Sequence, residues 1–80
     1  MAKVIFAAEM RLLTGVEDTQ IQATSYRAAL RELKQKFPQL SDQSFDKFAV
    51  AIDNIMIQSP MLETFQEQSE LVFVPKIPAG

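Results

Sequence analysis

The C-terminal end of this 80-residue chain offers one group for chemistry, the terminal carboxylate of Gly80. Four apolar residues, 71–74, precede Pro75 and Pro78. The prolines fix φ and push their preceding residues toward extended conformations, so we expect residues 76–80 to project as a tail. Gly80 has no Cβ to obstruct entry into a narrow partner pocket. We therefore predict that Gly80 is the reactive residue of the chain.

The composition excludes most catalytic machinery. The chain has no cysteine and no histidine, so it lacks thiolate ligands, the usual zinc ligands and the commonest general base. Its carboxylates show neither the spacing of a calcium loop nor that of an acid/base pair. We expect no metal, no bound cofactor and no enzymatic activity in the isolated chain.

The charge and hydropathy restrict the partners and the location. The net charge is −2 and the pI about 4.9, whereas a nucleic-acid-binding protein needs a basic surface. The longest apolar runs, residues 4–8 and 48–52, are too short to span a bilayer, and the N-terminus lacks the apolar core of a signal peptide. We expect a cytoplasmic protein without nucleic-acid or membrane partners.

The apolar pattern predicts five strands and one helix. The first strand occupies residues 3–8 and has two apolar faces; a connection over residues 9–14 then reaches Gly15. A second strand is expected at residues 20–23. The helix begins after an N-cap at Thr24 or Ser25 and ends before Pro38, with its apolar stripe at Tyr26, Ala29, Leu30, Leu33 and Phe37. Glu32 and Lys36 are spaced to form an i, i+4 pair.

The second half of the chain supplies the remaining strands. Residues 40–46 are polar and loop-like, and a third strand at 47–53 ends in the turn pair Asp53-Asn54. Short strands follow at 55–57 and 70–74, the latter after a crossover. The order β-β-α-β-β-β predicts an α+β domain, a ubiquitin-like β-grasp with a mixed sheet and one main helix on one face. We assign residues 1–75 to this domain and 76–80 to the tail.

Strand alternation identifies a second apolar face. If Val4, Phe6 and Ala8 face the helix, neighbouring residues face away from it. Six small apolar side chains then lie on the uncovered side: Ile5, Ala7, Ala49, Ala51, Val72 and Val74. An exposed apolar patch of this kind marks an interaction surface more often than an accident, although self-association is an alternative cover.

The sequence resembles the MoaD-type small subunit of molybdopterin synthase, within the MoaD/ThiS family of ubiquitin-like sulfur carriers. The N-terminal segment resembles that family's first strand and its Ala-x-x-Arg-x-x-x-Gly motif, here Ala8, Arg11 and Gly15. Residues 50–54 resemble its strand and turn, and residues 70–80 match its C-terminal pattern without gaps. The resemblance covers nearly the whole chain.

The resemblance implies a mechanism and partners. In this family an E1-like adenylating enzyme (MoeB-like) uses ATP to activate the C-terminal glycine, which is then converted to a thiocarboxylate. The molybdopterin synthase large subunit (MoaE-like) accepts the tail and uses the sulfur to build molybdopterin. By position, docking falls on Ile5, Ala7, Val72 and Val74, while Arg11 either anchors its region or contacts a partner.

The tail departs from the family at two positions. Its residues are Pro75, Lys76, Ile77, Pro78, Ala79 and Gly80. Lys76 replaces the second proline and Ala79 the penultimate glycine, where an added methyl group is expected to cost about 1 to 3 kcal/mol in a tunnel shaped for glycine. Three alternatives stay open: a carrier for thiamin or another sulfur metabolite, a ubiquitin-like protein modifier, and a non-catalytic β-grasp interaction module.

Overall fold

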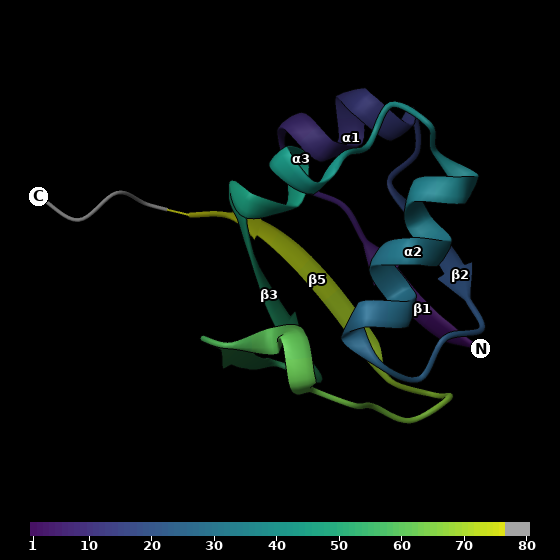
Figure 1. Ribbon diagram of the computed structural model, residues 1–80, viewed down its shortest axis with the longest axis vertical. Coiled ribbons are helices and arrows are strands. Elements are labelled where there is room, and N and C mark those ends of the chain that lie inside the picture. Colours follow the sequence, from purple (N-terminus) through teal and green to yellow (C-terminus); the bar gives the residue numbers. More distant parts are fainter. Residues whose placement is uncertain (77–80) are drawn as a thin grey trace, which may run out of the picture.

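The computed structural model describes residues 1–76 and contains one mixed five-stranded sheet (Figure 1). The strands are β1 (Ala2–Ile5), β2 (Asp18–Ile21), β3 (Phe48–Ile52), β4 (Ile55–Ile57) and β5 (Glu70–Pro75), in the spatial order β2-β1-β5-β3-β4. β1 and β5 are parallel neighbours in the centre, and the other three pairings are antiparallel. All five predicted strands are present, and the predicted α+β class is confirmed.

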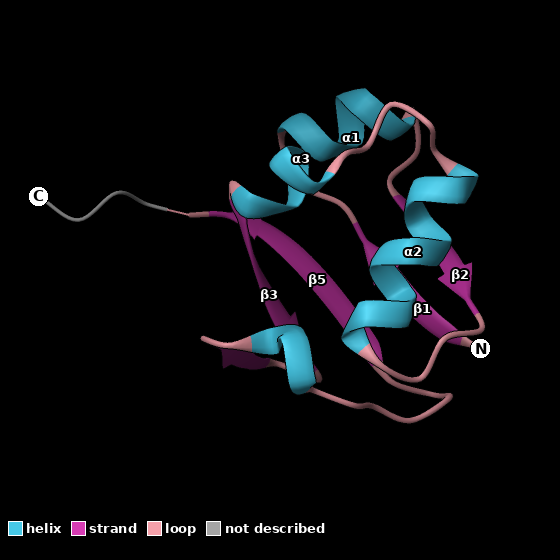
Figure 2. Ribbon diagram, in the orientation of Figure 1, coloured by secondary structure: helices cyan, strands magenta, loops and turns pink. Residues whose placement is uncertain are grey.

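The helix α2 (Tyr26–Lys36) packs across one face of this sheet (Figure 2). Its N-cap is Ser25, whose hydroxyl accepts a hydrogen bond from the Ala28 amide at 3.3 Å. Pro38 follows shortly after its end, and Phe37 packs edge-on against Phe6 with ring centroids 5.7 Å apart. The predicted apolar stripe therefore forms the cover of the core, which also contains the fully buried Val4, Phe6, Leu71 and Phe73.

Two short helices were missing from the sequence-based prediction. α1 (Glu9–Thr14) occupies the predicted connection, and α3 (Asp42–Asp46) lies in the predicted loop. Each contributes one buried side chain to the core, Met10 and Phe45 respectively. Helices this short are unstable in isolation, so packing of these side chains on the sheet holds them in place. Between β4 and β5 the chain also forms a single 3₁₀ turn, η1 (Pro60–Leu62).

The predicted Glu32–Lys36 pair was wrong. The Glu32 carboxylate instead accepts hydrogen bonds from the backbone amides of Gln22 and Ala23 at 3.0 to 3.1 Å. The Lys36 ammonium donates to the Thr19 hydroxyl at 3.1 Å and to the backbone carbonyl at Gln20. Both side chains thus connect α2 to β2 and the segment after it, where they satisfy backbone groups that an intrahelical pair would leave free.

Ala8 does not face the core as predicted, because β1 ends at Ile5 and the chain turns before α1 begins. Ala8 is exposed and adopts φ 52°, ψ −126° as the N-cap of α1. The amide of Met10 donates to the Ala7 carbonyl at 3.2 Å across this turn. A positive φ with this ψ suits glycine, so the alanine stores backbone strain of about 1 to 3 kcal/mol.

We therefore expect Ala8→Gly to stabilise the domain by about 1 kcal/mol, the relief of strain exceeding the added entropy of the unfolded chain. Urea unfolding monitored by circular dichroism measures the change. Ala7→Gly is the matched control: Ala7 has no positive φ, and its replacement is expected to destabilise by about 0.5 to 1 kcal/mol. Equal destabilisation by both substitutions would show that Ala8 is not strained.

The predicted Asp53-Asn54 turn is confirmed, with φ 51° at Asp53 and 71° at Asn54. The Asp53 carboxylate also reaches the start of β5, where it accepts hydrogen bonds from the Glu70 amide at 2.9 Å and from the Ser69 hydroxyl at 2.8 Å. The Glu70 amide first, and then the Ser69 hydroxyl, lower the pKa of Asp53 below its ordinary value of 3.8. Asp53 thus joins the β3–β4 turn to the strand that leads to the tail.

This arrangement predicts a pH-dependent stability. Because the folded-state pKa of Asp53 is the lower one, its ionised form stabilises the fold above the ordinary pKa. That contribution is lost as the pH falls below about 4 and passes through the lowered pKa. Asp53→Asn keeps the turn preference but cannot ionise, so its urea midpoint is expected to fall less between pH 7 and pH 3. Identical pH profiles for the two proteins would contradict this role.

Candidate partner-binding face

The side chains that alternate with the core residues form one apolar surface on the uncovered side of the sheet. Ile5 of β1 stands in register with Val72 of β5, and Val72 stands in register with Ala51 of β3. Val74 pairs with Ala49 in a second row. Because residues opposite one another on paired strands share a face, these five side chains lie together. We call the two rows the open face.

Burial separates the open face from the core. Val4, Leu71 and Phe73 are fully buried, whereas all six residues predicted for the open face are only half-buried. The buried side chains of α1, α2 and α3 belong to the core on the opposite side of the sheet. None of the helices within residues 1–76 therefore covers the open face with its buried side chains. The predicted division of the strands into two faces is confirmed.

Met56 extends the open face, although it was missing from the prediction. Met56 pairs with Ala51 across the β3–β4 hairpin and is 56% exposed. The row Ile5, Val72, Ala51, Met56 therefore crosses four strands. A two-residue turn at Asp53-Asn54 fixes this register, so the pairing of Met56 with Ala51 could have been predicted from the sequence.

Charged residues border the apolar rows. Asp18 of β2 is in register with Ile5, at one end of the longer row. Lys3 and Glu70 are cross-strand neighbours and are both exposed. By alternation all three belong to the same side of the sheet as Ile5 and Val72. The open face thus has an apolar centre and a polar border, which is the usual anatomy of a protein interface.

Ala7 and Arg11 lie outside the paired rows. Ala7 is half-buried and follows the end of β1, and Arg11 is exposed on α1. The Arg11 side chain forms no hydrogen bond or ion pair with another residue in the range 1–76, while its backbone carbonyl accepts the Gly15 amide at 2.9 Å. Gly15 ends α1 in the left-handed conformation with φ 77°, which explains the glycine of the Ala-x-x-Arg-x-x-x-Gly segment.

The base of the tail is fixed by the sheet. Pro75, named with the tail residues but assigned to the domain, is the last residue of β5 and stands in register with Phe48. The Lys76 amide donates to the Lys47 carbonyl at 3.0 Å, which adds one more tie. The predicted reactive residue Gly80 and its neighbours Ile77, Pro78 and Ala79 lie outside the described residues. β5 therefore carries both the centre of the open face and the attachment point of the tail.

Comparison with solved structures identifies the fold. A protein described as molybdopterin converting factor, subunit 1, from Pyrococcus furiosus matches with a TM-score of 0.75 and 16% identity, over 95% of this chain and 97% of that one. H. volcanii small archaeal modifier protein 1 matches with a TM-score of 0.67 and 14% identity, over 95% and 97%. The Haloferax volcanii HVO 2177 protein matches with a TM-score of 0.77 and 13% identity, over 99% and 85%.

These neighbours define the class of the fold. The chain has a ubiquitin-like β-grasp fold, which is the fold that the resemblance to the MoaD/ThiS carriers implied. Its structural neighbours include both a molybdopterin converting factor subunit and a small modifier protein. No family model and no curated protein matches the chain by sequence. Within residues 1–76, no helix is long and apolar enough to cross a membrane.

Proposed function

We propose that this protein is a sulfur carrier whose Gly80 carboxylate is adenylated and then converted to a thiocarboxylate. The observation that supports this most is the shared strand: β5 places Val72 and Val74 on the open face and ends at the base of the tail. A partner that docks on these residues would hold the chain beside its own active site. The tail residues that follow Lys76 would then enter that site.

The proposed chemistry needs no catalytic side chain from the carrier. A Gly80 carboxylate oxygen attacks the α-phosphorus of ATP, and pyrophosphate leaves to give an acyl-adenylate. Hydrosulfide (HS⁻) supplied by a sulfur donor then attacks the carbonyl carbon, AMP leaves, and loss of the S–H proton gives the thiocarboxylate. The resulting thiocarboxylate sulfur is a soft anion and acts as the nucleophile in the next transfer, as a thiolate does. The enzymes that bind the carrier supply all acid, base and metal groups.

We propose molybdopterin synthesis as the pathway, with a large catalytic subunit and an E1-like adenylating enzyme as partners. This assignment rests on the residues of the MoaD resemblance and on the likeness to the Pyrococcus furiosus subunit. The open face is the surface that we assign to both partners, and Arg11 is assigned to its border. Each partner would require a matching apolar surface, because the half-buried alanines leave little side chain to protrude.

Protein modification is the second candidate, favoured by the likeness to the small archaeal modifier protein. It shares the adenylation step, but the activated Gly80 carbonyl would then pass to a substrate lysine and form an isopeptide bond. The two functions differ in their product. A covalent adduct on lysine in cell extract supports modification, whereas a free thiocarboxylate supports sulfur transfer.

The penultimate residue offers a direct test of activation. We expect Ala79→Gly to raise the rate of adenylation by at least about fivefold, since relieving an overpacked methyl group is worth about 1 to 3 kcal/mol. Pyrophosphate release with ATP and a MoaD-activating enzyme measures it. The matched control is Ala2→Gly, at the far end of the sheet from the tail. If neither the native chain nor Ala79→Gly is adenylated while a working carrier is, the proposal is wrong.

A further inference from the structure

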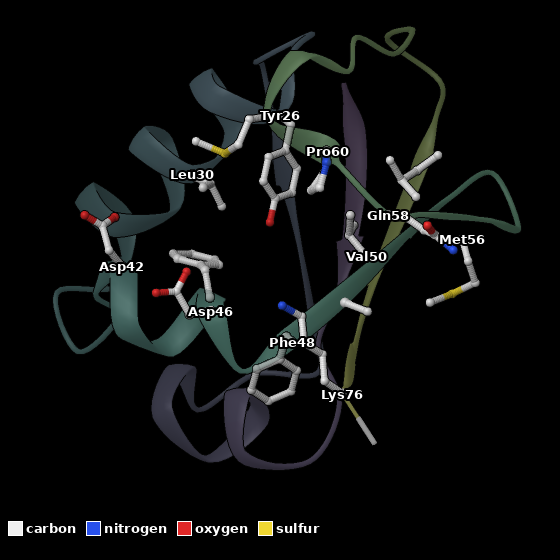
Figure 3. A pocket seen from close by; sticks show the side chains of 14 residues that line it. Tyr26, Leu30, Asp42, Asp46, Phe48, Val50, Met56, Gln58, Pro60 and Lys76 are labelled. Carbon is white, nitrogen blue, oxygen red and sulfur yellow. The ribbon is translucent and has the colours of Figure 1, made fainter. Parts of the chain in front are cut away.

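A cavity of about 590 Å³ lies between α2, α3 and the β3–β4 hairpin (Figure 3), and its lining includes Ala49 and Met56 of the open face. Its walls come from α2, α3, η1 and the ends of β3 and β4. Most of its lining is apolar: Tyr26, Leu30, Phe45, Phe48, Val50 and Pro60. The volume falls within the range of pockets that bind ligands or anchoring side chains, roughly 300 to 1,000 Å³. The proposed sulfur chemistry does not use this cavity.

The hydroxyl group of Tyr26 is a polar group within this mostly apolar lining. Tyr26 is only 4% exposed, and its hydroxyl forms no hydrogen bond with any residue in the range 1–76. Figure 3 shows the hydroxyl pointing into the cavity. Burial, and then the negative charge of Asp46, raise the pKa of Tyr26 to about 12, so the hydroxyl stays protonated. No fully buried side-chain polar atom within residues 1–76 lacks a partner, so this hydroxyl is open to the cavity, where an occupant can form a hydrogen bond with it.

The fixed charge near this hydroxyl is negative. Asp46 lies at the end of α3, where it is exposed and lines the cavity (Figure 3). Asp42 on the same helix also lines the cavity, but its carboxylate is neutralised by the Lys34 ammonium at 2.7 Å. Asp46 has no such ion pair within residues 1–76. Its short side chain on a packed helix holds the negative charge in place.

The one cation in the lining is the ammonium group of Lys76. Figure 3 shows its side chain entering the cavity from the side opposite Asp46. Lys76 is exposed and its ammonium is carried on a flexible four-carbon stem, so it can move out into water at little cost. Lys76 therefore leaves Asp46 without an ion pair within residues 1–76, and an incoming cation can pair with that carboxylate.

The rim of the cavity is built for contact with another chain. Met56 and Met61 both line it and are 56% and 49% exposed. Methionine side chains are flexible and polarisable, and they recur on surfaces that accept apolar side chains of varied shape. The net charge of −2 favours approach by a basic partner. The cavity is thus apolar inside, negative at Asp46 and adaptable at its edge.

We propose that this cavity binds a segment of a partner protein in which a large apolar side chain stands beside a lysine or arginine. The apolar side chain fills the space between Phe45 and Val50, and the cation pairs with Asp46 on the α3 side of the cavity, opposite the Lys76 side chain. Charge argues against the protein's own C-terminal residues as the occupant, because their terminal carboxylate would approach Asp46. The cavity shares Ala49 and Met56 with the open face, but the chemistry proposed at Gly80 does not require this binding, so either proposal can fail alone.

The test is a ¹⁵N NMR titration of the full chain with a blocked tetrapeptide containing tryptophan followed by lysine. We expect shifts at the amides of the cavity lining, and an affinity at least about tenfold above that of the same peptide with glutamate in place of lysine, as befits a charge-assisted hydrogen bond. A peptide with serine in place of tryptophan is expected to bind too weakly to saturate. Equal affinity for the lysine and glutamate peptides would overturn the proposal.

Variants identify the groups that bind. Asp46→Asn is expected to weaken binding of the lysine peptide about tenfold, because it removes the charge. Tyr26→Phe removes only the hydroxyl and is expected to weaken this binding about threefold. Met61→Ser is also expected to weaken binding of the lysine peptide. The matched control is Leu62→Ser, because Leu62 is the neighbouring residue, is 88% exposed and lies outside the lining. Thermal unfolding checks that each variant is folded. Unchanged affinity in folded Asp46→Asn would overturn the proposal.

Two further measurements exclude other occupants. The first compares the peptide-free spectra of the full chain and of the chain shortened to residues 1–76. If the amides of the cavity lining differ between these two spectra as they do on peptide binding, the protein's own C-terminal residues fill the cavity and the proposal is wrong. If the cavity signals move with protein concentration alone, a second copy fills it. If phenethylamine, a free amine with an aromatic ring, binds as tightly as the peptide, the site serves small molecules rather than a protein segment.

Discussion

Val72→Asp is expected to weaken binding of both proposed partners, the large subunit and the activating enzyme, at least about 100-fold. Val72 lies between Ile5 and Ala51 in the longer row of the open face, so it would lie at the centre of either interface. An unpaired carboxylate buried there loses its hydration and gains no partner, which costs about 3 kcal/mol or more. Isothermal titration calorimetry with each partner measures the loss.

Two controls separate this effect from damage to the fold. Val72→Thr keeps the branched shape and the strand preference, and we expect it to weaken binding less than about tenfold. Leu12→Asp places the same charge on an exposed residue of α1 outside the open face, and binding should be unchanged. Native affinity in a folded Val72→Asp protein would show that the open face is not the docking surface.

Phe73→Ala is expected to destabilise the domain by about 3 to 5 kcal/mol, a large part of the stability of a protein this small. Phe73 is fully buried on β5 and packs against the rings of Tyr26 and Phe45, with centroids 6.2 and 5.5 Å apart. It therefore joins α2 and α3 to the strand that carries the tail. Urea unfolding measures the change.

The matched control is the next residue of the same strand. Val74→Ala removes a half-buried side chain from the open face, and we expect a cost of about 1 kcal/mol or less. The ratio of the two effects tests the division of β5 into a core side and a partner side. If Val74→Ala destabilises as much as Phe73→Ala, residues of the open face are part of the core.

The strands and their two faces were predictable because local rules and tertiary packing agree there. Alternation of buried and half-buried residues in β3 and β5 follows the period of a strand, and Pro38 and Ser25 mark the limits of α2. The place of Met56 on the open face was equally predictable, because a two-residue turn at Asp53-Asn54 pairs Met56 with Ala51. The open face therefore depends on patterns that the sequence carries in full.

The errors have a common physical origin in tertiary contacts. α1 and α3 contain six and five residues, too few for a helical pattern, and exist because Met10 and Phe45 enter the core. Glu32 had a favourable helical neighbour but binds the backbone beyond β2, since unpaired amides there gain more from a carboxylate. The cavity was not foreseen at all, because its lining comes from five separate elements.

The measurement that tests the central proposal most directly is the intact mass of the chain after incubation with ATP, a sulfur donor and a MoaD-activating enzyme. We predict a mass increase equal to exchange of one oxygen for sulfur, located at Gly80 and absent from a chain that lacks this residue. A working carrier of the same family, run in parallel, establishes that the enzyme is active. An unchanged mass in the native chain and in Ala79→Gly, beside a converted control, would contradict the assignment as a sulfur carrier.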